Sequence, residues 1–475
     1  MDVAVAALDD AALEKLREQL LTASADAPTR PEALQSAETL AVALPVAAAS
    51  ELQSLLPTVI RTVKSLSRLV LKYVATVAAD TQNVAALVAL DDNLLPLLRV
   101  LQALVGRLQT RELDEGVNDA KELHRWLPFV VTACCFVEAA ELPGADLMQS
   151  VVLADETLDG CVKLLQVDGR AQLLSEYVAQ VVALCSQDVS KEEWVAAGSV
   201  NKRVVLHVVQ QVPFPHLGGD LLGRLLALTF PLVDDLIDAT QLVGVQLLRH
   251  IVRNVTPTEL RWYSDVLLEV LHTAMTSRKP TTLDVLLDCL VESLDKVSPP
   301  GELKHYDRFM PRMLGDTSLC SDVAVRVVFV RHLRTLVVRQ GAPHSLNVIR
   351  YLQPLLKVLI AGFESVNISL LEETLETLQA TVLAAWPRIA PHTDQILVGV
   401  LRAVAFCELF EAGAEFTPSP KEKEQLLALC EDILDLMHQV NAGNPVVSDM
   451  LATVGSQSPK LSPFCDRMQA KWTSR

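Results

Sequence analysis

The sequence has few aromatic residues and no long hydrophobic run. Phe, Trp and Tyr make up 4% of its 475 residues, although half of all residues are hydrophobic. Leu, Val and Ala therefore supply most of the apolar surface, which suits helices that pack on helices. The uncharged apolar stretches, such as 126–137, are shorter than the roughly 20 residues that a membrane-spanning helix needs. We therefore expect no membrane partner.

Basic residues are also in the minority. Lys and Arg number 41 against 58 Asp and Glu, which gives a formal net charge of −17. Nucleic-acid-binding proteins usually carry a basic stripe, and this sequence has no tract of Lys or Arg. The acidic balance predicts that nucleic acid is not a partner, and it helps to keep an apolar protein soluble.

Motifs for catalysis and metal binding are missing as well. The ten histidines are scattered without an H-x-x-x-H pair, Cys134 and Cys135 are adjacent rather than spaced as C-x-x-C, and no G-x-S-x-G occurs. Gly218 and Gly219 resemble part of a phosphate loop, but no strand precedes them and no G-K-S/T follows. We predict that the protein is not an enzyme and uses no cofactor or metal.

Cysteine usage predicts free thiols. The nine cysteines are odd in number, and the first 21 residues lack the basic start and apolar core of a secretion signal. Both features indicate a reducing compartment, so we expect a cytoplasmic or nuclear protein.

What the sequence does contain is a recurring pair of helices. Amphipathic segments at 260–275, 306–314, 348–360 and 393–406 recur about every forty residues, and each is followed by a second helix. One such pair cannot bury its apolar stripe alone, so neighbouring pairs must stack. The pattern predicts an all-α fold, a HEAT/armadillo-like α-solenoid of stacked antiparallel helix pairs without strands.

Pro and Gly suggest three parts of the chain. A cluster of turn residues at 213–219 places a boundary between irregular N-terminal helical repeats at 1–215 and regular HEAT-like repeats at 216–450. Residues 451–475 are rich in Ser, Lys and Pro, which predicts a loosely packed C-terminal tail.

Two charged segments are candidate sites. Asp234, Asp235 and Asp238 could suggest a magnesium site, but no further ligand has suitable spacing, so a solvated or turn-capping acidic face is favoured. Asp322 and Arg326 form the D-x-x-x-R spacing typical of a second HEAT helix. They predict a helix cap and an ion pair within a polar ladder between repeats.

Trp386, Pro387 and Arg388 are the candidate partner-binding residues. Pro387 should stop the helix that begins near Asn367, and Trp386 should lie on its apolar side as a core residue. A partner contact is the alternative, because Trp and Arg are enriched in binding hot spots. Thr417-Pro418 and Ser419-Pro420 could accept phosphate from a proline-directed kinase, although an ordinary loop is favoured.

The segment 230–275 resembles the Tti-two (Tel-two-interacting protein two) family, HEAT-like subunits of the TTT co-chaperone complex. The resemblance rests on Pro231, Leu232, Asp234, Asp235, Asp238 and Gly244, on the L-L-x-H-I segment 247–251, and on the W-P-R segment 386–388. It covers about 220–410.

The resemblance implies a non-catalytic scaffold that binds two larger HEAT-repeat subunits of TTT. Through them it would help the Hsp90 machinery to mature phosphatidylinositol 3-kinase-related kinases (PIKKs), which serve the DNA damage response and TOR signalling. An importin-type or other HEAT-repeat transport adaptor is the alternative. Such carriers are usually much longer, and the acidic residues here do not recur at one inner position of the repeat.

Overall fold

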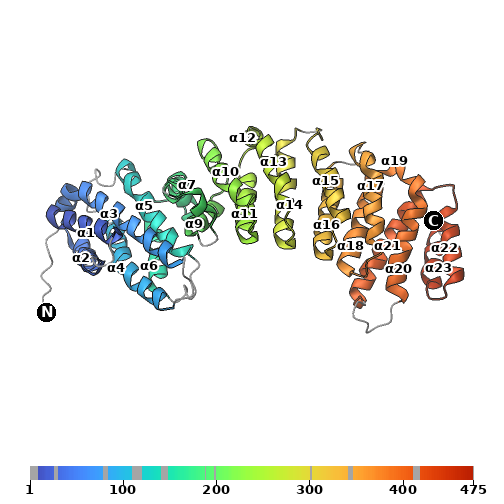
Figure 1. The fold of residues 1–475 in the computed structure, drawn as a ribbon, viewed down its shortest axis with the longest axis horizontal. Coiled ribbons are helices and arrows are strands. Elements are labelled where there is room, and N and C mark those ends of the chain that lie inside the picture. The colour runs from blue at the N-terminus through green and yellow to red at the C-terminus, as the bar shows by residue number, and fades with distance from the viewer. Residues whose placement is uncertain are drawn as a thin grey trace. The chain divides into compact units, whose positions relative to one another are not determined.

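Every regular element of the described chain is helical (Figure 1). The computed structural model describes residues 9–25, 30–78, 84–109, 120–140, 148–187, 189–196, 199–299, 302–340, 346–409 and 418–473. These residues form two compact units, Met1–Glu259 and Leu260–Arg475, each of which is described by itself. No helix in these ranges is both long enough and apolar enough to span a membrane.

The first unit is built from helices that pack on their neighbours in sequence and on the helix two further along. α1 and α3 lie side by side, as do α3 and α5, while α2, α4 and α6 form a second row against them. Its elements are α1 (Asp10–Ala25), α2 (Arg30–Ala43), η2 (Leu44–Val46), α3 (Ala49–Ala78), α4 (Val84–Gln109), α5 (Ala120–Glu138), α6 (Gln149–Leu165), α7 (Arg170–Ser186), α8 (Lys191–Val195), α9 (Val200–Gln211), α10 (Asp220–Val233), α11 (Asp238–Arg253) and α12 (Pro257–Arg261), which reaches the unit boundary.

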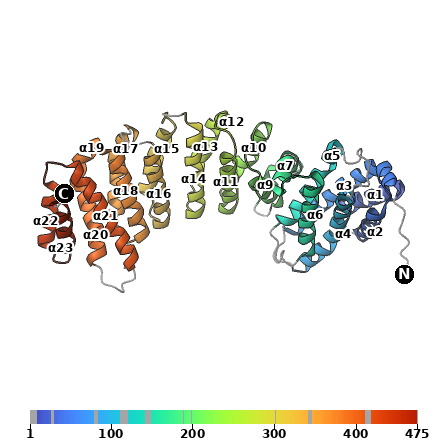
Figure 2. The ribbon, with the colours of Figure 1, turned by 180° about the vertical axis from the view of Figure 1, so that it is seen from behind.

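The second unit repeats one arrangement with more regularity (Figures 1 and 2). First helices α15, α17 and α20 form one row, and second helices α14, α16, α18 and α21 form the other. Its elements are α13 (Ser264–Ala274), α14 (Pro280–Val297), α15 (Tyr306–Leu319), α16 (Val323–Arg339), α17 (Leu346–Gly362), α18 (Ile368–Ala384), α19 (Trp386–Ile389), η4 (Ala390–His392), α20 (Thr393–Leu409), α21 (Pro420–Val440), α22 (Val446–Gln457) and α23 (Ser462–Thr473). The predicted all-α, HEAT-like architecture of stacked helix pairs is confirmed.

The apolar stripes predicted from the sequence form the cores of these pairs. On α14, Leu283, Leu286, Leu287, Leu290 and Leu294 are all buried, whereas the charged residues between them, Asp284, Asp288 and Glu292, are partly exposed. Each fully buried Leu stabilises the fold by about 1.5–3 kcal/mol relative to an exposed one. Neighbouring pairs must supply the other half of this contact, so the array is stable only as a stack.

The Pro/Gly turn at 212–219 lies inside the first unit, whereas the sequence suggested a domain boundary there. The amide of Phe214 donates to Asn254 Oδ1 at 3.1 Å, and the amide of Gly219 donates to Glu259 Oε1 at 2.8 Å. His250 Nε2 lies 3.0 Å from the carbonyl oxygen of Val212. These bonds attach the turn to α11 and α12, so the chain divides after Glu259 instead.

The C-terminal residues also differ from the loosely packed tail that was expected. Residues 451–473 complete α22 and form α23, on which Phe464, Cys465 and Met468 are buried. Trp472 Nε1 donates to Asp435 Oδ1 on α21 at 2.7 Å. The polar residues of this segment lie mainly on its outer face. Its few large side chains, such as Phe464 and Trp472, attach it to the neighbouring helices.

Candidate partner-binding surfaces and the ladders that support them

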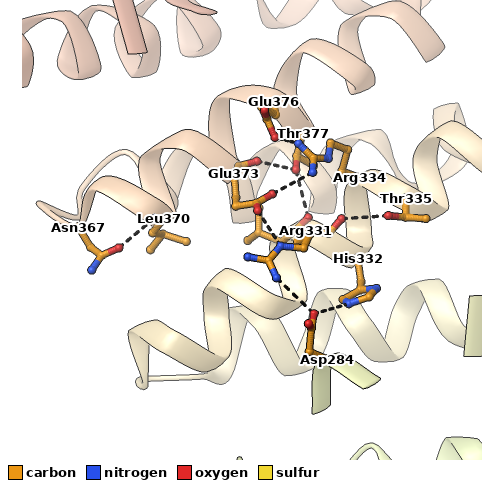
Figure 3. A network of polar contacts seen from close by, with 11 residues as sticks. Asp284, Arg331, His332, Arg334, Thr335, Asn367, Leu370, Glu373, Glu376 and Thr377 are labelled. Atoms are coloured by element: carbon orange, nitrogen blue, oxygen red, sulfur yellow. Dashed lines mark hydrogen bonds and ion pairs between the residues drawn. The ribbon is translucent and has the colours of Figure 1, made fainter. Parts of the chain in front are cut away.

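A ladder of polar side chains joins three consecutive second helices of the second unit (Figure 3). Asp284 on α14 lies 2.9 Å from His332 Nε2 and 3.4 Å from Arg331 Nη1, both on α16. Because an ionised carboxylate can only accept hydrogen bonds, the imidazole donates this one. Arg331 Nε in turn donates to Glu373 Oε1 on α18 at 2.7 Å.

The ladder continues along α16 and α18. Arg334 Nη2 lies 3.3 Å from Glu373 Oε2, and Arg334 also pairs with Glu376. Acidic and basic groups therefore alternate across the three helices.

The ladder perturbs the ionisation of its members. The hydrogen bond from His332, aided by the nearby Arg331 guanidinium, holds the pKa of Asp284 below its ordinary value. The hydrogen bond to Glu373 raises the pKa of Arg331 above its ordinary value. Both groups are therefore charged at neutral pH, and the contact between them is an ion pair.

The first helices carry a matching set of ion pairs. Arg308 of α15 pairs with Glu269 of α13, Arg350 Nη1 of α17 lies 3.1 Å from Asp307 Oδ2 of α15, and Arg402 of α20 lies 3.3 Å from Glu364. The partners are 39, 43 and 38 residues apart, which reproduces the repeat length. Exposed pairs of this kind contribute little stability each, so their main effect is to align neighbouring pairs.

The Trp386–Arg388 corner follows α18, as the sequence predicted. Asn367 caps α18 by accepting from the amide of Leu370 at 2.9 Å, and Pro387 lies in the first turn of the short helix α19. Trp386 is only half-buried rather than a full core residue, while Pro387 and Arg388 are exposed. Within the described residues, Arg388 forms no ion pair, so its guanidinium and one side of the indole face solvent.

The Asp234–Asp238 segment forms the turn between α10 and α11. Asp234 is the C-cap residue of α10, and Asp235 Oδ1 accepts from the amide of Ile237 at 2.7 Å. Gly244 lies under this turn, and a Cβ placed on it would be 2.6 Å from the amide nitrogen of Val233. The Asp235 carboxylate therefore acts as a turn former.

Asp322 caps α16 but does not pair with Arg326. Its Oδ1 accepts from the amides of Ala324 at 2.8 Å and Val325 at 3.1 Å. In the described part of the chain, Arg326 has no ion-pair partner, so the expected pairing is wrong. The carboxylate turns back over the helix N-terminus, where it accepts from two amides that have no partner within the helix.

These sequence-derived residues do not converge on one site. Asp234, Asp235 and Gly244 belong to the first unit, whereas the Asp322 cap and the Trp386 corner occupy separate turns of the second. Thr417 lies outside the described residues. Ser419 caps α21 in a reciprocal pair with Glu422, in which the amide of Ser419 donates to Glu422 Oε2 at 2.8 Å.

Sequence patterns did not single out two residues with unusual exposure, the buried His332 and the exposed Trp262. His332 is buried within the α16 stripe, and nothing in its spacing singled it out. Trp262 is 84% exposed. A signal for it was present, since Trp262, Asp265 and Glu269 follow helical spacing on the polar face.

The described residues lack a metal-binding cluster, and most of their thiols are buried. They contain no group of three or more His, Cys, Asp or Glu side chains that could hold a metal. All nine thiols are free, and only Cys320 is not buried. Burial raises the pKa of Cys161 to about 12, which leaves little nucleophilic thiolate at neutral pH.

Known proteins give two kinds of similarity. No family model matches the sequence. Human TELO2-interacting protein 2 is 25% identical over 288 residues, which cover 58% of this chain and 54% of the human protein. The mouse protein of the same name is 25% identical over 290 residues, with the same coverage. The chain thus spans about half the length of the curated relatives it matches.

Among solved structures, Kap121p bound to Pho4p aligns with a TM-score of 0.48 at 14% identity, over 96% of this chain and 45% of Kap121p. A complex of Kap95p with RanGDP aligns with a TM-score of 0.45 at 14% identity, over 98% of this chain and 57% of the matched chain. The sequence matches thus confirm the resemblance found from the motifs: this chain is similar to the TELO2-interacting protein 2 family.

Proposed function

We propose that this protein is a non-catalytic interaction subunit of the TTT co-chaperone complex. The observation that carries the proposal is the sequence similarity to proteins named for their interaction with TELO2. A stack of helix pairs suits this role, because it offers a long outer surface while its core stays closed.

The proposed role has three parts. The protein binds two larger HEAT-repeat subunits, one of them of the TELO2 type. The assembled complex cooperates with the Hsp90 machinery. The clients are phosphatidylinositol 3-kinase-related kinases, whose maturation and stability depend on the complex.

The Trp386–Arg388 corner is the proposed contact in the second unit. A half-buried indole is held in one orientation and still offers an apolar surface, and Arg388 adds an uncommitted positive charge beside it. Trp and Arg in such settings often supply the largest single contributions to binding. The Arg331–Glu373 bond also ties α18, the helix before the corner, to α16.

Co-purification of the tagged full chain with the two larger subunits tests the proposal. We expect wild type to recover both subunits in a fixed ratio, and Trp386→Ala with Arg388→Glu to reduce recovery by at least about tenfold. Arg278→Glu, which reverses an exposed charge on the α13–α14 turn, is the matched control. Unchanged recovery by the double variant would reject this contact. Binding to a GTP-loaded small GTPase, without either subunit, would favour a transport adaptor instead.

A further inference from the structure

The turn between α10 and α11 presents two apolar side chains to solvent. Leu236 is 95% exposed and Ile237 is 52% exposed. Single exposed apolar residues are common on protein surfaces, whereas two adjacent ones form a small apolar patch that a partner can cover. Two properties of the turn decide which partner can bind it: how firmly its conformation is fixed, and which charges surround the apolar pair.

The turn is held from within by two contacts. Asp235 Oδ1 accepts from the amide of Ile237 at 2.7 Å, which fixes the backbone on either side of Leu236. Gln241 is buried and its Nε2 donates to the carbonyl oxygen of Val233 at 3.1 Å, which ties the start of α11 to the end of α10.

Close packing beneath the turn adds a third constraint. A Cβ on Gly244 would lie 2.6 Å from the carbonyl carbon of Leu232, so α11 and α10 touch through their main chains. The tip therefore keeps one conformation, and a partner would not have to order it on binding.

The turn is also anchored to the helices beside it. Lys202 on α9 is buried, and its Nζ donates to the carbonyl oxygen of Ala196 at 2.6 Å and lies 3.4 Å from Thr240 Oγ1 on α11. Thr240 Oγ1 lies 3.4 Å from the carbonyl oxygen of Val195. α8, α9 and α11 are thus joined at Thr240, in the first turn of α11.

Carboxylates surround the apolar tip. Asp234 and Asp235 precede Leu236, and Asp238 follows Ile237 in the first turn of α11. We propose that the turn 234–238 is a docking knob: Leu236 and Ile237 enter an apolar pocket on a partner protein, and Lys or Arg side chains at the rim of that pocket pair with the carboxylates.

The negative charge of the turn favours this partner over a second copy of the chain and over a membrane surface. A second copy of this chain would bring the same carboxylates together in a self-complementary contact, and like charges at an interface are unfavourable. A membrane surface is disfavoured because its anionic lipids repel them. The partner's identity rests on the proposed function, so the pocket is assigned to one of the two larger HEAT-repeat subunits.

Binding of the purified full chain to those purified subunits tests the assignment. We expect Leu236→Ala to weaken binding by at least about tenfold. Asp234→Lys should weaken binding more at low salt than at high salt. The basic rim of the pocket repels the new lysine, and salt screens this repulsion. Leu319→Ala is the matched control, because Leu319, the last residue of α15, is 87% exposed and no pair of carboxylates directly precedes it. Unchanged thermal unfolding of each variant would show that folding is intact.

The outcomes separate this inference from the proposed function. If wild type does not bind the subunits, both fall. If wild type binds and the Leu236 and Asp234 variants bind equally well, only the knob is rejected. Equal weakening by Leu319→Ala, or loss of self-association as the sole effect of Leu236→Ala, would also overturn it.

Discussion

Gly244 on α11 lies against the main chain of Leu232 on α10, so closely that a Cβ at residue 244 would be 2.6 Å from the Leu232 carbonyl carbon. Backbone cannot move aside as the end of a flexible side chain can. This contact explains why a glycine occupies the middle of α11, where glycine otherwise costs helix stability. It also fixes the spacing of the two helices that flank the exposed Leu236 and Ile237.

Gly244→Ala should therefore destabilise the first unit, by about 1–3 kcal/mol or more, because the two helices must separate. Chemical denaturation of the full chain, followed by helical circular dichroism, measures this. Gly106→Ala in α4 is the matched control, since a Cβ there would meet nothing within 4 Å. Alanine at 106 should leave stability unchanged or raise it by up to about 1 kcal/mol. Equal effects at the two positions would contradict the close-packing explanation.

The Asp322 cap makes a separate prediction for the second unit. Asp322→Ala should cost about 0.5–2 kcal/mol of stability, because the amides of Ala324 and Val325 lose their acceptor. Asp322→Asn should retain most of it, since an amide oxygen can accept the same bonds. A double-mutant cycle with Arg326→Ala should show a coupling near zero. A clear coupling would mean that the two side chains pair after all.

The ladder predicts a pH dependence of stability. The folded-state pKa of Asp284 lies below its unfolded value, so its contribution is present above the unfolded pKa, about 3.9, and is lost as the pH falls through the lowered folded value. Thermal unfolding of Asp284→Asn should therefore lose less stability than wild type between about pH 5 and pH 3. Asp394→Asn on α20, whose carboxylate has no hydrogen-bond partner among the described residues, is the control and should keep the wild-type slope.

Thiol labelling should follow burial. Cys320, on the turn before α16, is the one cysteine of the nine that is not buried. Burial raises the pKa values of Cys134 and Cys135 well above the ordinary value, and both lie inside α5. With native protein and iodoacetamide, mass spectrometry should detect modification at Cys320 first and at the others only after unfolding. Early labelling at Cys134 or Cys135 would show that the first unit opens readily.

Most of the fold could be predicted from the forty-residue repeat in the sequence. Helix pairs must bury their stripes on one another, so a forty-residue period in Leu and Val already requires a stack, and α15, α17 and α20 begin close to where that period predicted. Local chemistry was equally visible: Asn367 caps α18 and Asp322 caps α16, because a cap depends only on residues within one turn.

The sequence by itself determined the helical pairs, their period, their caps and the absence of recognisable catalytic motifs, since each depends on neighbours within a few residues or on a repeated stripe. Only the tertiary structure decided that His332 lies within hydrogen-bond distance of Asp284 and that Leu236 is exposed to solvent. It also decided that the Pro/Gly turn near residue 215 lies inside a unit. These depend on which residues lie opposite one another after stacking. A side chain forty residues away is chosen by the register between helices, and that register emerges only when the whole array packs.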